Sequence, residues 1–364
     1  MNKVGKVIIG IILAIFIIAV IAFMIGIIYY NNSLKAYENE ENGQEIVIEI
    51  PEKTGVSAIA NLLEEKNVIK NSFTFKVYLK LHKKINLQAG KYVFNNGKDD
   101  VESVVKKLTA GDIIDDSISI TFVEGKNMRY IAKTIAEKTN NTEEDVFNLV
   151  EDVEYLTEII NKYWFLTEEM ANVDIYYPLE GYLMPDTYTF ENKDVSVKTI
   201  FSKMLDATDK YLSANREDVE STNLTVHQLL TLASIAELEG STYEERAEII
   251  GVFYNRLNKN MSLGSDVTTY YALKKELADG DLSSKEIATE NPYNTRAANM
   301  NGKIPIGPIC NPSKDSIKAV IYPKETDALY FVSDKNGKAY FTKTYEEHQT
   351  LIKNLKESNL WYTY

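Results

Sequence analysis

The pattern of apolar and polar residues changes sharply after residue 30. From Val7 to Tyr30 no residue is charged over about 24 positions, which is long enough for a helix that spans a bilayer. A secretory signal peptide usually has a shorter apolar core of about 7–15 residues, and no small-x-small cleavage site follows Tyr30. Because the lysines of residues 1–6 precede this segment, we expect a retained single-pass anchor in the cell membrane, with residues 1–6 in the cytoplasm and the rest outside.

The next part of the chain alternates short strands with short helices. Residues 31–45 are polar and acidic and are expected to form a stalk. In residues 46–115, the periodicity predicts strands over 46–50 and 89–94 and helices over 56–66, 71–81 and 101–108.

An internal echo follows at an offset of 72 residues, since the pattern from Glu52 to Lys66 recurs from Glu124 to Lys138. A strand followed by a short turn and an amphipathic helix is the shape of small glycan-binding modules such as LysM, but it is also common in ordinary structure. We therefore expect a LysM-like module over 46–115, and residues 116–175 are a candidate second unit of this kind.

The remainder, 116–364, is predicted to be a mixed α+β domain. Helices are expected over much of 139–175 and over 195–212, 226–239, 241–257 and 345–356. The turn at 334–337 between two short apolar runs indicates a β-hairpin. The fold class is thus α+β, with a single N-terminal transmembrane helix in front.

The predicted helix over 226–239 carries the most informative polar residues. Thr225 and Gln228 have the spacing of a capping box at its start, and Gly240 lies just past its end. At about 3.6 residues per turn, Glu239 continues the apolar face, whereas Glu237 points roughly 200° away. A carboxyl group on an apolar face, near the negative end of the helix dipole, has a raised pKa and suits a general acid. The alternative is a solvated helix end that carries two glutamates.

Composition narrows the chemistry. The net charge of −13, with no basic stripe outside the N-terminus, argues against nucleic acid as a partner. Cys310 is the only cysteine, so no intrachain disulfide can form. The three histidines lie far apart and no Gly-Lys pair is followed by Ser or Thr, so we expect no metal, no nucleotide site and no cofactor. Cys310 is interpreted as a small residue in a Pro-rich loop and not as a nucleophile.

Two turn-rich segments add polar groups of another kind. Residues 178–190 crowd prolines and aromatic rings beside carboxylates, which suit the faces and hydroxyls of sugars, or else form a structural loop. Residues 291–312 form a long Pro-rich loop that we expect to be ordered, and Asp266 either caps the following helix or faces a cleft.

These motifs in this order resemble the YceG-like endolytic murein transglycosylases over nearly the whole chain. The motifs that match are Glu180–Tyr188, Leu232–Glu239, Val252–Leu257, Asp266–Thr268, Pro292–Thr295, Gly307–Ile309 with Asn311–Pro312, Leu329–Val332 and Glu347–His348.

The resemblance implies cleavage of the bond between N-acetylmuramic acid and N-acetylglucosamine within peptidoglycan strands, with formation of 1,6-anhydro ends and termination of nascent strands. It places the catalytic acid on Glu239, and it implies cell-wall synthases as partners. The matched motifs, together with Tyr271 three residues after Thr268, supply the candidate substrate-binding residues: Glu180, Asp186, Tyr188, Glu237, Asn255, Asp266, Thr268, Tyr271, Asn294 and Thr295.

The sequence departs from the family pattern at three loop positions. Arg296 stands where an aromatic residue is usual, Ile306 replaces a proline, and Gln349 replaces an asparagine. Two other functions remain open at this point: a glycan-binding scaffold without catalysis, and a hydrolytic muramidase that uses Asp266 as its second carboxylate.

Overall fold

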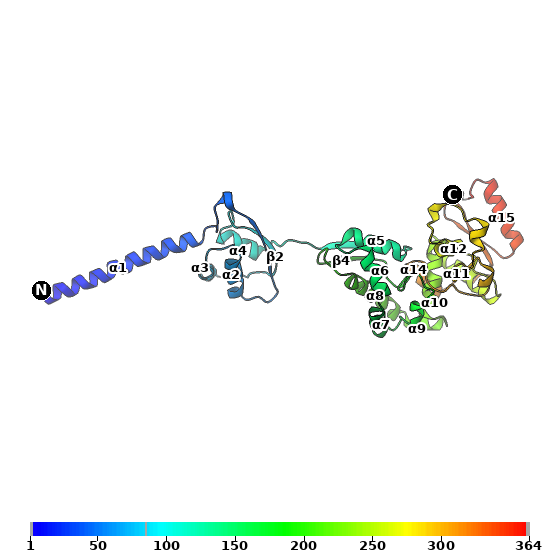
Figure 1. The fold of residues 1–364 in the computed structure, drawn as a ribbon, viewed down its shortest axis with the longest axis horizontal. Coiled ribbons are helices and arrows are strands. Elements are labelled where there is room, and N and C mark those ends of the chain that lie inside the picture. Colours follow the sequence, from blue (N-terminus) through cyan, green and yellow to red (C-terminus); the bar gives the residue numbers. More distant parts are fainter. Residues whose placement is uncertain (1–2, 84–85, 362–364) are drawn as a thin grey trace. The chain divides into compact units, whose positions relative to one another are not determined.

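The computed structural model describes residues 3–83 and 86–361 and divides the chain into two compact units, Met1–Asp116 and Ser117–Tyr364 (Figure 1). The described residues contain three sheets, each of two antiparallel strands, among many helices. The predicted α+β class is therefore confirmed.

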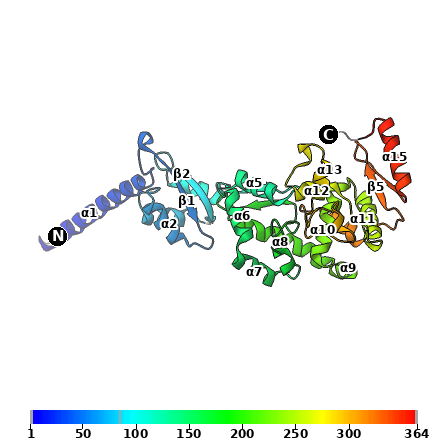
Figure 2. The same ribbon diagram turned by 45° about the vertical axis from the view of Figure 1, so that its right-hand side comes forward.

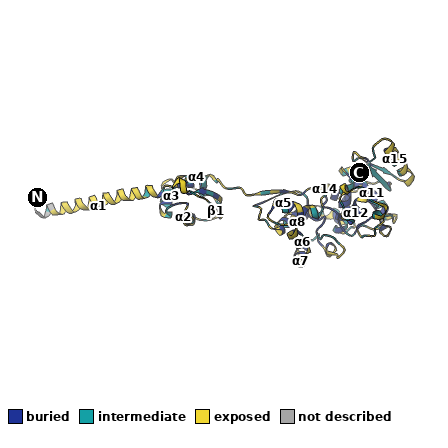
Figure 3. Ribbon diagram, turned by 45° about the horizontal axis from the view of Figure 1, so that its top comes forward, coloured by how far each residue is buried: buried dark blue, intermediate teal, exposed yellow. Residues whose placement is uncertain are grey.

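The first unit begins with helix α1 (Lys3–Ser33), which fits a single-pass membrane anchor. Its apolar segment Val7–Ser33 is 27 residues long. At about 1.5 Å per residue it reaches roughly 40 Å, more than the ~30 Å hydrocarbon core of a bilayer. Its side chains are exposed along almost the whole length (Figure 3), as expected for a helix whose apolar surface requires a lipid environment.

A small module with its own core follows the anchor. Strand β1 (Glu45–Ile50) pairs with β2 (Gly90–Asn95), and two helices, α2 (Val56–Glu65) and α3 (Ser72–Leu81), lie between them in sequence. Helix α4 (Val101–Ala110) ends at Gly111, whose φ of 67° is the left-handed conformation that favours glycine. The order of strands and helices is as predicted; the LysM-like assignment remains a prediction.

In the second unit, β3 (Ile118–Thr121) pairs with β4 (Thr187–Phe190), and three helices are inserted between these strands. These are α5 (Met128–Lys138), α6 (Glu143–Glu151) and α7 (Val153–Lys162). The echoed strand and helix are present, and their buried residues belong to the same hydrophobic core as α10. The assignment of 116–175 as a second LysM-like unit remains a prediction. The helical prediction is wrong for 163–175 apart from the short 3-10 helix Glu168–Ala171, because aromatic residues at the start of this segment pack into the core without a helical period.

Helix α10 (Val226–Glu239) lies at the centre of the second unit and packs against α11 (Tyr243–Asn258), α12 (Asp266–Ala272) and α14 (Lys314–Ile321). Helix α11 starts at Tyr243, two residues after the predicted start at 241, and Thr242 is its N-cap. The predicted hairpin is confirmed as β5 (Tyr330–Ser333) and β6 (Ala339–Thr342), which pack against α15 (Tyr345–Glu357; Figure 2). The remaining elements are α8 (Val197–Ala214), α9 (Arg216–Ser221), α13 (Ser284–Ile287) and the short 3-10 helices Glu40–Asn42, Glu168–Ala171, Leu277–Asp279 and Ala298–Met300.

Candidate active site

Helix α10 is fixed at both ends as the sequence predicts. Thr225 and Gln228 form the reciprocal capping box at its start. Gly240 follows its last residue with an ordinary φ of −118°, so no left-handed turn requires glycine there. A Cβ at this position would approach the Arg246 backbone nitrogen to 3.0 Å, and this close approach is what favours glycine.

The helix has no exposed face between Leu229 and Ala236, since all of these residues are buried. A helix that is buried all round has no single apolar stripe. The direction of the side chain therefore does not by itself show whether Glu237 or Glu239 is the candidate acid, because both residues lie in the last turn of the helix. Their partners separate them.

Glu237 is surrounded by donors. Its Oε1 accepts a bond from the Arg246 guanidinium at 2.8 Å, and its side chain is only 6% exposed. Its Oε2 accepts bonds from the Ser313 backbone N–H (2.8 Å), the Ser313 hydroxyl (2.5 Å) and the Ser316 hydroxyl (2.6 Å). These four hydrogen bonds join the end of α10 to Arg246 on α11 and to Ser313 and Ser316 at the start of α14.

Glu239 has a much sparser environment. Its Oε1 accepts one hydrogen bond, from the Ser265 hydroxyl at 2.5 Å, and no other hydrogen bond to its carboxyl group is found among the described residues. Burial raises the pKa of Glu239 to about 7, with Asp266 acting in the same direction, while the Ser265 bond and the guanidinium groups of Arg256 and Arg296 lower it. The carboxyl group can therefore exist both protonated and ionised near neutral pH.

Ser265 is held by two buried threonines of the candidate set. Its backbone N–H donates to the Thr295 hydroxyl at 2.9 Å, and its carbonyl accepts from the Thr268 hydroxyl at 2.7 Å. Both threonines are fully buried. Thr268 and Thr295 thus lie next to the site without facing it, and they fix the serine that contacts Glu239. Sequence reasoning missed Ser265, although its place before a short helix in a Gly-Ser-Asp sequence is a signal for a fixed side chain.

Two arginines complete the electrostatics. Arg256 is nearly buried and donates to the carbonyls of Leu263 and Leu329. Arg296, on the long loop, pairs with Asp266 at 3.1 Å. The departure from the family pattern at position 296 therefore places a cation near Glu239, and Asp266 is half-exposed at the start of α12.

Glu180, which its motif suggests as a substrate-binding residue, is buried in the core of the second unit. It is 2% exposed and accepts bonds from the Met128 N–H (2.9 Å), the Tyr271 hydroxyl (3.1 Å) and the Asn311 amide (3.2 Å). Burial raises the pKa of Glu180 to about 8. Glu180 and Tyr271 therefore connect distant segments inside the core.

The other candidate substrate-binding residues include both buried and exposed side chains. Asn294 is fully buried and bonded to the Thr269 hydroxyl and to the carbonyls of Ile287 and Thr289. The amide of Asn255 donates to the carbonyls of Thr326 and Ala328, and Tyr188 donates to Met184. Asp186 is exposed. The structure thus brings Glu239, Asp266, Thr268 and Thr295 together and gives Glu180, Asn255, Tyr188 and Asn294 bonds to the protein itself.

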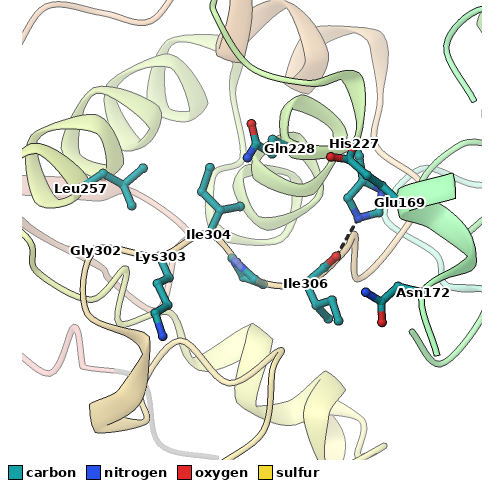
Figure 4. A pocket seen from close by; sticks show the side chains of 10 residues that line it. Glu169, Asn172, His227, Gln228, Leu257, Gly302, Lys303, Ile304 and Ile306 are labelled. Carbon is teal, nitrogen blue, oxygen red and sulfur yellow. Dashed lines mark hydrogen bonds between the residues drawn. The ribbon is translucent and has the colours of Figure 1, made fainter. Parts of the chain in front are cut away.

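A cleft of about 550 Å³ opens at the other end of α10 (Figure 4). It is lined by Glu169, Asn172, His227, Gln228, Leu257 and residues 302–306, and the His227 Nε2–H donates to the Ile306 carbonyl at 2.6 Å. His227 lies 12 positions before Glu239, which is about 18 Å along a helix. This cleft is therefore separate from the surroundings of Glu239. Among the described residues, no group of three or more His, Cys, Asp or Glu could hold a metal ion.

Comparison with known proteins agrees with the motifs. The model of the YceG-like family matches residues 48–354. A protein of Bacillus subtilis (strain 168) named endolytic murein transglycosylase is 34% identical over 324 residues, which cover 89% of this chain and 88% of that protein. A protein of the same name from Streptococcus pneumoniae serotype 2 (strain D39 / NCTC 7466) is 32% identical over 331 residues, which cover 86% of this chain and 59% of that protein.

The crystal structure of a yceG-like protein from Listeria monocytogenes is similar to this chain with a TM-score of 0.60 and 35% sequence identity. The similarity covers 85% of this chain and 100% of that chain. The fold, the order of the motifs and these relatives agree, and the chain belongs to the YceG-like family.

Proposed function

We propose that this chain is a membrane-anchored endolytic murein transglycosylase that cleaves peptidoglycan strands at the bond between N-acetylmuramic acid and N-acetylglucosamine. The observation that carries this proposal is the environment of Glu239, a largely enclosed carboxyl group with one hydrogen-bond donor and a pKa raised to about 7 by burial. The names and extent of the relatives support the same reaction.

In the first step, the protonated carboxyl group of Glu239 donates its proton to the glycosidic oxygen. The bond between that oxygen and C1 of the muramic acid breaks, the N-acetylglucosamine end leaves as an alcohol, and positive charge develops at C1. A carboxyl group whose pKa is close to the working pH is well suited to give up this proton.

In the second step, the carboxylate of Glu239 accepts the proton of the 6-hydroxyl on the same muramic acid. The 6-oxygen bonds to C1, which closes the 1,6-anhydro ring and regenerates the protonated acid. No water is consumed, and because the nucleophile belongs to the same sugar, its effective concentration is high. One carboxyl group therefore serves in both steps.

The neighbours of Glu239 fit this double role. The Ser265 hydroxyl holds Oε1, which leaves Oε2 to meet the substrate. Arg256 and Arg296 lower the pKa of Glu239, which means that they favour the carboxylate that exists between the two steps. Asp266 and Asp186 are the exposed carboxylates of the candidate set, and we assign them to substrate contact.

The buried candidates have a positioning role in this proposal. Thr268 and Thr295 fix Ser265, and Asn294 fixes the loop that carries Thr295 and Arg296. Glu180, Tyr271 and Glu237 hold the surrounding segments together.

We further propose the finer features that the resemblance implies. The module over residues 46–115 is LysM-like and binds glycan, the anchor leaves the N-terminus in the cytoplasm, and the second unit acts outside the cell beside cell-wall synthases. The two lysines before the apolar segment support this orientation.

Mass spectrometry of digested glycan strands tests the reaction. The chain is incubated with long, purified peptidoglycan strands, and the new ends are identified together with the lengths of the products. Internal cuts that yield 1,6-anhydro-muramic ends, lighter than reducing ends by one water, are expected. Reducing ends would instead indicate the hydrolase that uses Asp266, and the absence of new ends would indicate a glycan-binding scaffold; either result overturns the proposal.

A further inference from the structure

Helix α3 in the first unit has an outer face that is both apolar and basic. At about 100° per residue, Phe73, Lys76, Val77, Lys80 and Leu81 share an arc of roughly 140° that points away from the core. Phe73 is 68% exposed and Leu81 is 66% exposed, although both are large apolar side chains. Among the described residues, neither of the two lysines forms an ion pair.

The charge of the surrounding sequence is unusual for this chain. From Lys66 to Lys98 there are eight lysines and no Asp or Glu, in a protein whose net charge is −13. The expectation that no basic stripe lies outside the N-terminus is therefore wrong for this segment. Exposed aromatic and aliphatic groups interspersed with lysines are typical of helices that lie in a membrane interface, where lysine stems cover apolar surface and the ammonium groups meet lipid phosphates.

The structure also places α3 near the end of the anchor. Leu34 directly follows α1 and packs against the module core, and its carbonyl accepts a bond from the Val101 N–H at 2.9 Å. Burial raises the pKa of the Tyr78 phenol of α3, and Glu102, Asp100 and Tyr30 act in the same direction. The module therefore begins to pack directly after α1, at Leu34, within the residues that the sequence predicts to be a stalk.

We propose that the outer face of α3 rests on the anionic phospholipid surface of the membrane that α1 spans, with Phe73 and Leu81 inserted between headgroups and Lys76 and Lys80 against lipid phosphates. The anchor keeps this face at a high effective concentration near the lipid, so a weak contact suffices. The module is then held against the bilayer by two points of contact. This inference does not depend on the proposed reaction.

A fluorescent label reports the contact in the full-length protein. The only native cysteine, Cys310, is 1% exposed, so cysteines introduced by Phe73→Cys or Leu81→Cys react selectively with an environment-sensitive dye. Val56→Cys is the matched control, because Val56 is also an exposed apolar residue (43%) but lies on α2, beyond the end of β1 that is farther along the chain from the anchor. Each protein is reconstituted into vesicles of phosphatidylcholine, with or without phosphatidylglycerol, that carry nitroxide-labelled lipid.

In anionic vesicles, we expect blue-shifted emission and several-fold stronger nitroxide quenching at positions 73 and 81 than at position 56. Quenching should fall with added salt, and the double substitution Lys76→Glu with Lys80→Glu should weaken the contact by about tenfold or more. Equal, water-like emission at all three positions in both kinds of vesicle would overturn the proposal. If a soluble polyanion added to neutral vesicles produced the same blue shift of the dye emission at positions 73 and 81, the proposal would also be overturned. That result would identify an anionic polymer as the occupant of this face.

Discussion

Glu237 and Glu239 are separated by one residue at the end of α10, yet their surroundings differ in every respect that matters for chemistry. Four hydrogen bonds hold Glu237, and one of them comes from the guanidinium of Arg246. One serine hydroxyl holds Glu239, whose pKa burial raises to about 7. Both carboxyl groups are largely enclosed, so burial alone does not separate a structural acid from a reactive one. What separates the two acids is the number and the charge of the groups that donate hydrogen bonds to each carboxyl group.

Glu239 and Glu237 also differ in how many contacts depend on the carboxyl group. A proton can leave and return to Glu239 without breaking a network, because only one hydrogen bond depends on its state. Removal of the Glu237 carboxylate would leave Arg246, whose side chain is 13% exposed, without its ion-pair partner.

The largest effect is expected for Glu239→Gln. Because this residue donates and accepts the proton in our proposal, turnover of glycan strands should fall at least about a thousandfold. Stability should not fall: the folded-state pKa lies above the ordinary 4.5, so the ionised form destabilises the protein as pH rises toward and past about 7, and glutamine removes that loss. Strand turnover and thermal unfolding at pH 5 and pH 8 check both statements. Near-parental release of anhydro ends would refute the assignment.

Glu237→Gln is expected to act on stability. It removes the charge that neutralises Arg246 and should lower the free energy of unfolding by about 3 kcal/mol. Denaturant titration measures this loss. Glu248→Gln on α11 is a control, because the side chain of its partner Lys324 is 55% exposed and that pair is more open to solvent than Glu237 with Arg246. If Glu237→Gln folds with parental stability but loses all turnover, the two glutamates have been assigned the wrong way round.

Ser265→Ala should reduce kcat/KM by about tenfold, since it removes the one hydrogen bond that positions the Glu239 carboxyl group. That bond lowers the pKa of Glu239, so its loss should move the alkaline limb of the pH profile upward. Ser265→Thr keeps the hydroxyl and should restore most of the rate. An unchanged pH profile in Ser265→Ala would show that the bond does not affect the working acid.

The smallest effect is expected for Arg296→Phe, which restores the aromatic residue usual in the family. Loss of this cation, and of the partner that neutralises Asp266, should raise the pKa of Glu239 further and shift the alkaline limb upward. Added salt should reduce the difference between the two proteins, because this pair is partly exposed. A shift to lower pH would contradict the role given to Arg296.

Much of the fold followed from local pattern. The long apolar helix, the capping box at Thr225, the order of elements in the N-terminal module and the hairpin before α15 were all predicted, because each depends on periodicity or on residues a few positions apart. The irregular segment over 163–175 was not, because its aromatic residues are placed by the core and not by a helical period.

The sequence by itself determined the anchor, the helices and strands, the family and the two acids at the end of one helix. Only the tertiary structure decided what each acid contacts. Ser265 and Arg296 reach Glu239 from one side, and Ser313 and Ser316 reach Glu237 from another, across 76 and 79 positions of the chain. A pKa depends on burial and on the donors and charges within a few ångströms, and in this protein distant segments supply them.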